Sequence, residues 1–391
     1  MIGPAAGQSA PDDGRATEPP LRRQRRARQA PARRPGMLQV VRAAFGQGSR
    51  SARLLLLGVA ALVLLWPLSS LVEVNQDTGD LVAGTLAMVA GAAPMATVGA
   101  LIVIALAARR HHWVAVALAA VAALLPWFFM ASYAVSNQPE RAEAAVGLRT
   151  MLVNAHQGAA SAPDIVAAAA AGQVDVLVVT ELSGALAHDL TVAGLDQVVS
   201  AAWVRLPGQS GVMDDPQAGM GVWTRSGITL DQPRDVPGTQ WPSMTATVTV
   251  GDPAGSTTGT EAGPEATRVT LIAGHVAPPG PDNGRRWATD LAVLREATVQ
   301  ATGPRMLLAN LNATSWHADF RQFTAAGIRD AADVLGRGPR PSWPTWSPLA
   351  ILPLDHAMVS DRIGVESVET VVIGGSDHRA LIATLRVPAS P

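Results

Sequence analysis

The chain of 391 residues contains no cysteine and no lysine. Without cysteine it can form no disulfide, no zinc–thiolate site and no thiol nucleophile, and this absence is compatible with either side of a membrane. All 30 basic residues are arginine, which we interpret as the codon bias of a GC-rich genome and not as a functional signal. The formal net charge of -1 argues against a generally basic protein that coats nucleic acid.

Apolar residues are concentrated near the N-terminus. Hydrophobic residues make up 48% of the chain and its mean hydropathy is +0.20, which is more apolar than one ordinary soluble domain. Three segments carry no charge and reach the roughly 20 residues that cross about 30 Å of hydrocarbon. The first is too long for a cleavable signal peptide and is followed by two others. We therefore expect three transmembrane helices within residues 54–135, at Leu54–Val72, Leu81–Ala107 and Trp113–Ala134.

The distribution of arginine predicts the orientation of these helices. Residues 1–53 are rich in arginine and proline, Arg109 and Arg110 follow the second segment, and the loop at 73–80 has acids but no base. The positive-inside rule then places the N-terminus in the cytoplasm and everything from about residue 138 outside it, as in a multi-pass protein of the cell membrane. We interpret residues 1–53 as a disordered tail that sets the topology. Binding of nucleic acid or anionic lipid by this tail is the alternative.

After a linker at 136–147, residues 148–391 are long enough for one large α/β domain. The segments 148–153, 159–171 and 174–179 read as strand, helix and strand, which predicts a parallel pair with a right-handed crossover. The strands that follow have no helices between them, which favours antiparallel pairing. We expect a four-layer α/β sandwich of two mixed β-sheets flanked by helices. Further strands are expected at 197–204, 219–224, 244–250, 268–275, 305–311, 357–359, 368–373 and 380–387, helices at 285–298 and 318–326, and an exposed loop at 251–267.

Three polar residues stand at the ends of expected strands. Glu181 closes an apolar run, and a carboxylate stranded there needs a cation or an arginine unless it is simply solvated. Asn154 ends the preceding strand, where it could bind a phosphate oxygen, assist a metal or serve as a turn residue. His275 ends a later strand, and a single histidine in such a place is usually incidental.

Three further motifs follow near the C-terminus. They are Asn310-Leu311-Asn312-Ala313-Thr314, Leu354-Asp355-His356 and Ser376-Asp377-His378. His378 would suit a general base if a second carboxylate held its tautomer, and Asp355 could supply that carboxylate. The alternative is that the last two motifs are unrelated turns.

In this order, the motifs resemble those of the endonuclease/exonuclease/phosphatase superfamily, metal-dependent phosphodiesterases that include deoxyribonuclease I and the neutral sphingomyelinases. The resemblance implies Glu181 as the principal Mg²⁺ ligand with Asn154 beside it, and Asp377 as a second metal residue. It also implies that Asp355 orients His378, that His275 binds phosphate or protonates the leaving group, and that Asn312 binds phosphate. Where the family motif has an aspartate that accepts a hydrogen bond from the attacking water or deprotonates it, this chain has Asn310. An amide cannot accept that proton, and loss of a general base typically slows a reaction about 10²–10⁴-fold.

Two hypotheses remain. In the first, the chain is a membrane-anchored, extracytoplasmic phosphoester hydrolase that uses Mg²⁺ or Mn²⁺ and direct attack of water on phosphorus. In the second, it is a degenerate module that binds phosphate or a lipid headgroup without turnover. The substrate could be a lipid headgroup or a nucleic acid, because arginines of the outer domain are scattered among about as many acids. We predict no stable protein partner.

Overall fold

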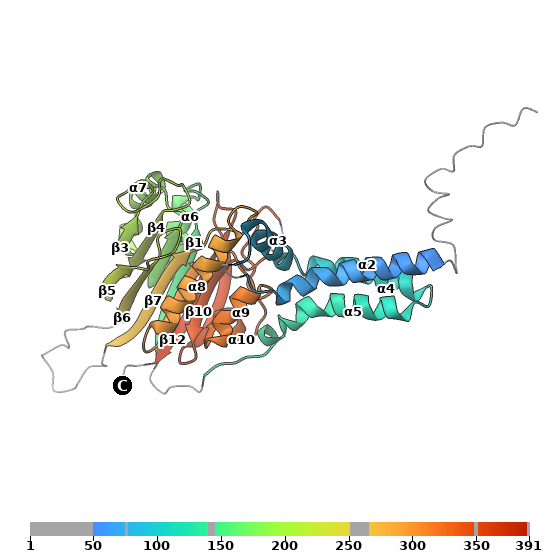
Figure 1. Ribbon diagram of the computed structural model, residues 1–391. Helices are drawn as coiled ribbons and strands as arrows, with labels where there is room; N and C mark the ends of the chain where they lie inside the picture. Colours follow the sequence, from blue (N-terminus) through green and yellow to red (C-terminus); the bar gives the residue numbers. More distant parts are fainter. Residues whose placement is uncertain (1–49, 75–76, 140–144, 251–265, 348–350, 389–391) are drawn as a thin grey trace, which may run out of the picture.

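The computed structural model describes residues 50–74, 77–139, 145–250, 266–347 and 351–388. The Arg-rich tail before residue 50 and most of the expected loop at 251–267 lie outside these ranges. Figure 1 shows a β-sheet domain from which a bundle of helices projects as a stalk. The N-terminal region comprises α2 (Arg50–Leu68), η1 (Ser69–Leu71), α3 (Asp80–Gly91), α4 (Met95–Ala108), α5 (Trp113–Phe128) and η2 (Ala131–Ala134).

Two six-stranded mixed sheets form the domain. The first has the order β11-β12-β1-β2-β4-β3 and the second the order β5-β6-β7-β8-β10-β9. The strands are β1 (Ala145–Asn154), β2 (Val176–Thr180), β3 (Ser200–Arg205), β4 (Met220–Thr224), β5 (Ile228–Asp235), β6 (Met244–Val250), β7 (Thr267–His275), β8 (Arg305–Asn310), β9 (Ile328–Asp330), β10 (Asp355–Ser360), β11 (Gly364–Val372) and β12 (Arg379–Pro388). The helical elements are α6 (Ala162–Ala171), α7 (Gly184–Val192), η3 (Leu195–Gln197), α8 (Gly284–Gln300), α9 (Ala318–Ala325) and α10 (Ala331–Leu335).

Side chains alternate between two cores along the strands. In β2, Val176 and Val178 face the other sheet, whereas Leu177 and Val179 pack on the side of α6 and α7. In β8, Leu308 points between the sheets, while Leu307 packs with α8 and α9. This period of two is what a sheet buried on both faces requires. The expected sandwich of two packed mixed sheets flanked by helices is therefore confirmed.

Neighbouring strands that are joined through a helix are parallel. The pair β1–β2 is parallel and is joined through α6, as expected, and β7–β8 is a second parallel pair joined through α8. The pairs β2–β4, β3–β4, β5–β6 and β6–β7 are antiparallel. The carboxyl ends of β1 and β2 in one sheet and of β7 and β8 in the other carry the polar motifs singled out above.

The prediction that Leu81–Ala107 forms one continuous membrane helix is wrong. Its first part is α3 and its second part is α4, and the two are bent by 68°. Pro94, which has no backbone N–H and disfavours helix at the residue before it, stands at the break. The third expected segment is helical as α5 and then passes into the 3₁₀ turn η2. Within the described residues, one helix, Arg50–Leu71, is long and apolar enough to cross a membrane, or two if the bent pair counts as one.

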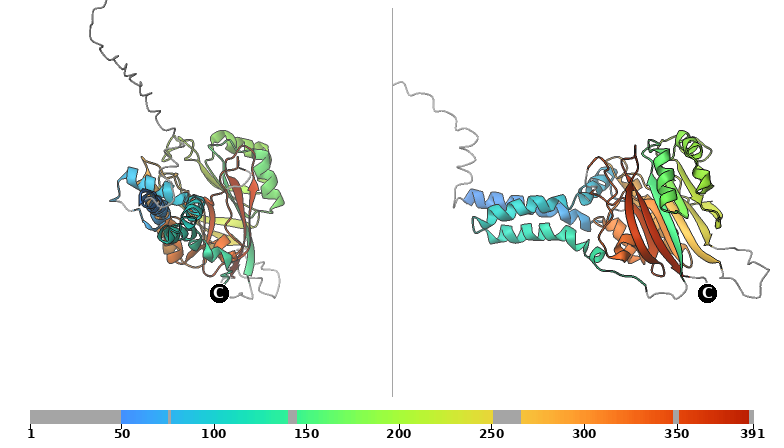
Figure 2. Two further views of the ribbon diagram at one scale, coloured as in Figure 1. Left: turned by 90° about the vertical axis from the view of Figure 1, so that its right-hand side faces the viewer. Right: turned by 180° about the vertical axis from the view of Figure 1, so that it is seen from behind.

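The stalk consists of α2, α4 and α5, which lie side by side in the views of Figures 1 and 2. Alanines fill its interior: Ala60, Ala100, Ala115 and Ala119 have no exposed surface. Large apolar side chains cover its outside, among them Leu54, Leu62, Leu65, Val98, Leu101, Ile102, Leu124 and Phe128. This is the inverse of a water-soluble bundle, and small residues between helices with apolar residues outside are typical of packing in lipid.

Candidate active site

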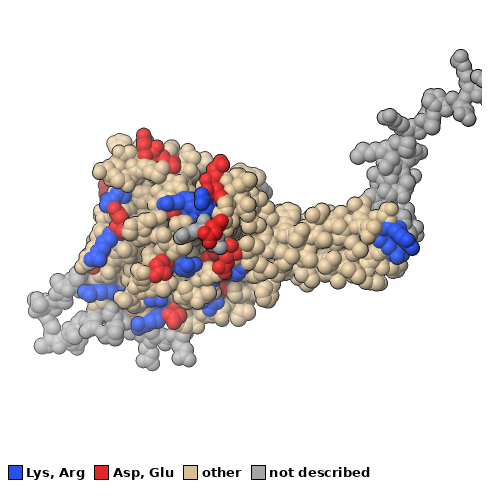
Figure 3. All heavy atoms as spheres, in the orientation of Figure 1, with Lys and Arg blue, Asp and Glu red and all other residues tan. Residues whose placement is uncertain are grey.

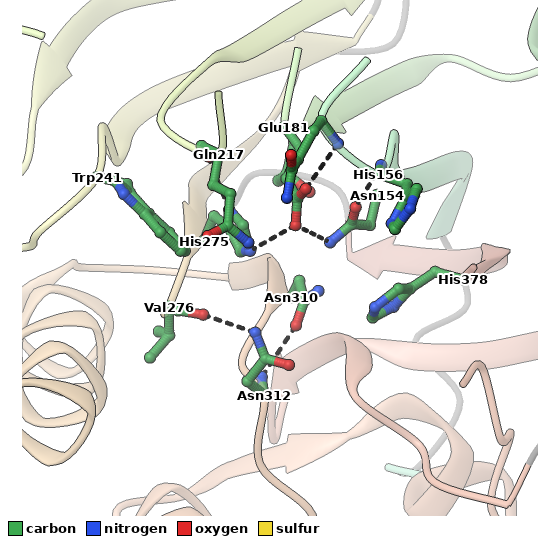
Figure 4. Close-up of polar contacts among 12 residues, drawn as sticks. Asn154, His156, Glu181, Gln217, Trp241, His275, Val276, Asn310, Asn312 and His378 are labelled. Atoms are coloured by element: carbon green, nitrogen blue, oxygen red, sulfur yellow. Dashed lines mark hydrogen bonds and ion pairs between the residues drawn. The ribbon is translucent and has the colours of Figure 1, made fainter. Parts of the chain in front are cut away.

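Five polar residues meet where strand ends of the two sheets come together. In the second sheet, Asn310 is the register partner of His275 on one side and of Asp355 on the other, so these three form a row. Asp355 begins its strand, but β10 runs antiparallel to β8, and this brings it to the same edge. Asn154 and Glu181 stand at the corresponding ends of β1 and β2 in the first sheet. Figure 4 shows four of them, namely Asn154, Glu181, His275 and Asn310.

Glu181 is held by two hydrogen bonds. The Asn154 side-chain amide donates to its Oε1 at 2.9 Å, and the backbone N–H of Gln157 donates to its Oε2 at 2.7 Å. The residue is 6% exposed and has φ of 56°. A non-glycine residue in this left-handed region is strained, and such strain is found where a side chain must be aimed.

The surroundings of Glu181 suit a cation. Among the described residues, the one ion-pair partner recorded for its carboxylate is His275, whose Nε2 lies 3.6 Å from Oε1. Burial lowers the pKa of His275, and Glu181 opposes that shift only in part, so the ring is neutral near pH 7. A buried carboxylate without a permanent positive neighbour is costly. The residues present therefore fit a divalent cation.

The site fits a cation that is bound by few protein ligands. The described part of the chain contains no group of three or more His, Cys, Asp or Glu residues arranged to hold a metal. Mg²⁺ is commonly bound through one or two carboxylates, with water and substrate phosphate completing its shell. A single buried carboxylate that lines an open pocket meets this requirement.

His275 is buried between the sheet and an aromatic ring. Its ring centroid lies 4.4 Å from that of Trp241, and its Nδ1 lies 3.3 Å from the backbone carbonyl of Gln217. Its Nε2 is buried and has no hydrogen bond from the described residues. Trp241 and Gln217 were not predicted as neighbours of His275, because both come from loops far from it in the chain.

Asn310 and Asn312 are tied to each other and to the neighbouring strand. The Asn310 Oδ1 accepts a hydrogen bond from the backbone N–H of Asn312 at 2.9 Å, and the Asn312 side-chain amide donates to the Val276 carbonyl at 2.8 Å. Asn310 has no exposed surface, and its Nδ2 is without a hydrogen-bond partner in the described residues. An aspartate in its place could keep the bond to Asn312 and have its second oxygen free.

His378 and Asp355 form a close pair. The distance from His378 Nδ1 to Asp355 Oδ2 is 2.6 Å, which leaves Nε2 as the ring nitrogen free to act. Burial alone would lower the pKa of His378, but the charge of Asp355 and the hydrogen bond outweigh it and raise the pKa above 6.5. The ring is also positioned by its backbone N–H, which donates to Ser376 Oγ at 3.0 Å. The geometry suits a histidine that accepts a proton through Nε2.

Asp377, which is expected as a second metal residue, lines the same pocket as Glu181. Its Oδ1 lies 2.8 Å from His156 Nδ1, and its Oδ2 accepts a hydrogen bond from Trp343 Nε1 at 3.1 Å. Both carboxylate oxygens therefore have protein partners. His156 and Gln157, which follow Asn154 in one tight turn, were missed in the sequence, where the turn shows no recognisable motif.

Four of these residues line one pocket of about 430 Å³. Its polar part includes Glu181, Asn312, Asp377 and His378, and its remaining lining is largely apolar. Unexpectedly, α3 contributes one wall. The lining residues are Ala87, Met88, Gly91, Ala92, His156, Gln157, Glu181, Gln217, Pro278, Pro279, Asn312, Thr314, His317, Trp343, Leu352, Leu354, Asp377 and His378.

Residues 151–378, from β1 to His378 itself, match the Endonuclease/Exonuclease/phosphatase family. The chain belongs to this family. Its members are usually phosphoester hydrolases, and they typically use divalent metal ions. The family assignment confirms the resemblance seen in the sequence motifs, whereas the roles of the individual residues stay predictions.

Several solved structures are similar to this chain. Humanized TDP2 of D. rerio has 16% identity, a TM-score of 0.48, and coverage of 61% of this chain and 98% of its own. The human Nocturnin catalytic domain with bound sulfate has 15% identity, a TM-score of 0.44, and coverage of 62% and 96%. A mannosyl-6-phosphatase of Bacteroides thetaiotaomicron has 12% identity, a TM-score of 0.43, and coverage of 61% and 99%. No curated protein matches the chain in sequence.

Proposed function

We propose that the chain is a membrane-anchored, extracytoplasmic phosphoester hydrolase that depends on a divalent metal, Mg²⁺ or Mn²⁺, and uses water as the nucleophile. The observation that carries this proposal is the pairing, in one pocket, of a buried carboxylate that suits a cation, Glu181, with a histidine held by an aspartate, His378. The first would take the charge of a phosphate group, and the second would take a proton from water.

Each residue has a role in this proposal. A divalent cation at Glu181 would neutralise phosphate oxygens and stabilise the charge of the transition state. Asp355 accepts the Nδ1–H of His378, so that in the neutral ring Nε2 is the unprotonated nitrogen that can accept the proton of the attacking water. Asn154 orients Glu181, and His275 and Asn312 would contact the phosphate. Asp377, held in place by His156 and Trp343, would help to hold the metal.

Asn310 is expected to weaken the reaction. Its amide cannot accept a proton, so the proposed mechanism depends on His378 alone for that step. The site would then bind a phosphate well and turn it over slowly, with a deficit of about 10²–10⁴-fold relative to a site with a carboxylate there.

We also propose that the stalk spans the membrane with its far end in the cytoplasm. At about 1.5 Å per residue, α2 is about 28 Å long and α5 about 24 Å, close to the hydrocarbon thickness of about 30 Å. Figure 3 shows that the stalk carries no charge along its length and has basic residues at the end away from the domain. Those of the described residues are Arg50 and Arg53 at the start of α2 and Arg109 and Arg110 after α4. This asymmetry supports a cytoplasmic end there.

In terms of domains, we propose a cytoplasmic tail at 1–53, a membrane region within 54–135, a linker at 136–147 and the family domain at 148–391. The structure changes one detail of this division. Because α3 packs on the family domain, the stalk is the part expected to be embedded in the membrane, and among its described helices α2 alone is long enough by itself to cross.

The second candidate function is a module that binds a phosphate or lipid headgroup without turnover. One observation favours it. The Asn310 Nδ2 is buried and without a protein hydrogen-bond partner among the described residues, and an N–H donor in this place suits a bound anion better than it suits proton abstraction.

The two functions differ in turnover. Full-length protein in nanodiscs should hydrolyse a soluble phosphodiester or phosphomonoester with Mg²⁺ or Mn²⁺ and stop when a chelator is added, and His378→Ala should lose this activity. Val192→Ala, on an exposed face of α7, serves as the matched surface control. Phosphate binding without turnover of any ester tested would instead establish the binding module.

A further inference from the structure

The helix α3 is fixed to the family domain by close backbone packing. A Cβ added to Gly84 would come within 1.8 Å of the Gly280 carbonyl oxygen, and one added to Gly284 within 2.0 Å of the Gly84 nitrogen. Only glycine allows this approach of α3 to the start of α8. Buried Ala83 and Ala87 belong to the same apolar cluster as Trp287. The helix is therefore part of the domain core.

Two polar contacts reinforce this attachment. The Arg285 guanidinium donates to Asp80 Oδ2 at 2.7 Å at the first turn of α3. Nearer its end, His317 Nε2 lies 2.9 Å from the Ala87 carbonyl. Attachment at both ends holds the face of α3 that lines the pocket in a defined position.

The pocket joins a polar floor to an apolar lining. Glu181 and His378 mark the floor. Ala87 and Met88 of α3 and Ala92 just after it form one apolar wall, and Trp343, Leu352 and Leu354 are further apolar residues of the lining. A small polar phosphoester would contact the floor but leave these residues facing water, which is unfavourable for the apolar surface.

The helix α3, which forms this wall, is connected directly to the stalk. Only residues 92–94 separate α3 from α4, whose outer surface is apolar. Leu81 and Val82 on α3 are also exposed, at 65% and 54%. Exposed apolar residues thus occur on both the stalk and α3, and α3 also lines the pocket. In contrast, no arginine is among the described residues that line the pocket, although nucleic-acid sites depend on cations that meet phosphates.

We propose that the substrate is a membrane lipid phosphoester, with its phosphate at Glu181 and His378 and the beginning of its hydrocarbon part against Ala87, Met88 and Ala92. This inference rests on the proposed function, since it names the substrate class of the same site. The helix α3 then acts as a specificity element that admits a lipid from the membrane surface. A nucleic acid or a sugar phosphate would gain nothing from this wall.

The test measures binding of alkylphosphonates, which resemble phosphoesters but are not hydrolysed. Full-length protein is placed in nanodiscs of a phosphate-free glycolipid with Mg²⁺, and dissociation constants are measured for methyl-, ethyl-, butyl- and hexylphosphonate. Complete burial of a methylene tightens binding about fourfold, so a half-buried chain should gain about twofold per methylene. The expected result is a steady fall in Kd from methyl- to hexylphosphonate.

Two substitutions on α3 test whether the dependence of Kd on chain length arises at the pocket. Met88→Gln should flatten the dependence of Kd on chain length. Leu81→Gln replaces an exposed residue of the same helix that does not line the pocket, so it should keep the dependence. Equal Kd values for all four compounds would overturn the inference. Flattening by both variants alike would also overturn it, because it would indicate general partition into the membrane surface.

Binding and turnover separate the two proposals. A chain-length dependence without hydrolysis of any phosphoester would contradict the proposed function and support the lipid site. Hydrolysis of soluble esters without a chain-length dependence would support the function and contradict the lipid site. As a final arm, phosphatidic acid placed in the nanodisc should displace hexylphosphonate, whereas the same concentration of glycerol phosphate in solution should displace it far less.

Discussion

The Nδ1 of His378 and the Oδ2 of Asp355 are 2.6 Å apart, although the residues are 23 positions apart in the chain. The bond spans two structural elements, because His378 lies in the turn between β11 and β12 of one sheet and Asp355 begins β10 of the other. It therefore forms only when the two sheets are packed. The proposed chemistry at His378 therefore depends on the packing of the two sheets.

Asp355→Asn should reduce kcat by about 10²–10⁴-fold while leaving the fold intact. An amide facing Nδ1 can donate its N–H there, which would move the ring proton to Nε2 and block the atom that accepts the proton from water. A matched control exists on the same strand, where His356 Nδ1 lies 2.5 Å from Asp330 Oδ2 outside the pocket. Asp330→Asn should lower stability but keep the kcat of the folded protein. Equal losses of kcat in both variants would count against a specific role for Asp355.

Asn310→Asp should raise hydrolysis of a generic phosphodiester by at least about tenfold, which corresponds to roughly 1.4 kcal/mol of activation free energy. The substitution keeps the shape of the side chain and the bond to the Asn312 N–H, and it adds the missing proton acceptor. His378→Ala in the Asn310→Asp background should abolish the gain. If the wild-type protein is already fast and Asn310→Asp is neutral, another residue accepts the proton.

The stability of the domain should decrease as the pH falls from about 6.5 to about 4 in a way that depends on His317. Burial lowers the pKa of His317 to about 4, and backbone hydrogen bonds to Ala87 and Thr314 oppose the shift only in part. The unfolded chain, with a pKa near 6.5, binds the proton first, so stability is lost as the pH falls through this window, by about 3 kcal/mol in total.

His317→Gln tests this dependence. A glutamine can still donate to the Ala87 carbonyl but does not titrate. Thermal unfolding of the full chain, measured between pH 7 and pH 4.5, should show a smaller loss of stability for His317→Gln than for the wild-type protein. The same loss in both proteins would show that other groups determine the response to acid.

The orientation of the stalk can be tested directly because the chain has no cysteine of its own. We expect Val192→Cys, on an exposed face of the domain, to react in intact cells with a maleimide that does not cross membranes. His111→Cys, at the far end of the stalk, should react only after the cells are permeabilised. Leu101→Cys, which is exposed along the stalk, should react poorly in both cases. Labelling of His111→Cys in intact cells would reverse the proposed orientation.

The sequence predicted the parts of this structure that follow from local patterns. Continuous apolar runs such as 176–179 read as buried strands, and polar residues directly after them, such as Glu181, were recognised as candidate site residues at strand ends. The structure does bring Asn154, Glu181, His275, Asn310 and Asp355 together. Whether they perform the expected chemistry is a matter for the experiments above.

Other parts could not be read from local patterns. The strand β5 was missed because it is a largely exposed edge strand with Pro233 in it, so it lacks the alternation of a half-buried strand. The seat of α3 depends on glycines that meet across nearly 200 residues, at Gly84 and Gly284. The segment's apolar composition was read as a membrane span because hydropathy does not distinguish lipid from a protein surface as the environment of a helix.

The central claim is that Glu181 holds a catalytic divalent metal, and the most direct measurement is the rate of phosphodiester hydrolysis as Mg²⁺ is titrated, for the wild-type protein and for Glu181→Gln. The amide keeps the size of the side chain and removes its charge. We predict a saturable increase in rate with Mg²⁺ for the wild-type protein, and for Glu181→Gln a rate at least about 10²-fold lower at every Mg²⁺ concentration that the wild-type protein needs. Hydrolysis by the wild-type protein that does not depend on Mg²⁺ or Mn²⁺, or that is unchanged in Glu181→Gln, would contradict the account.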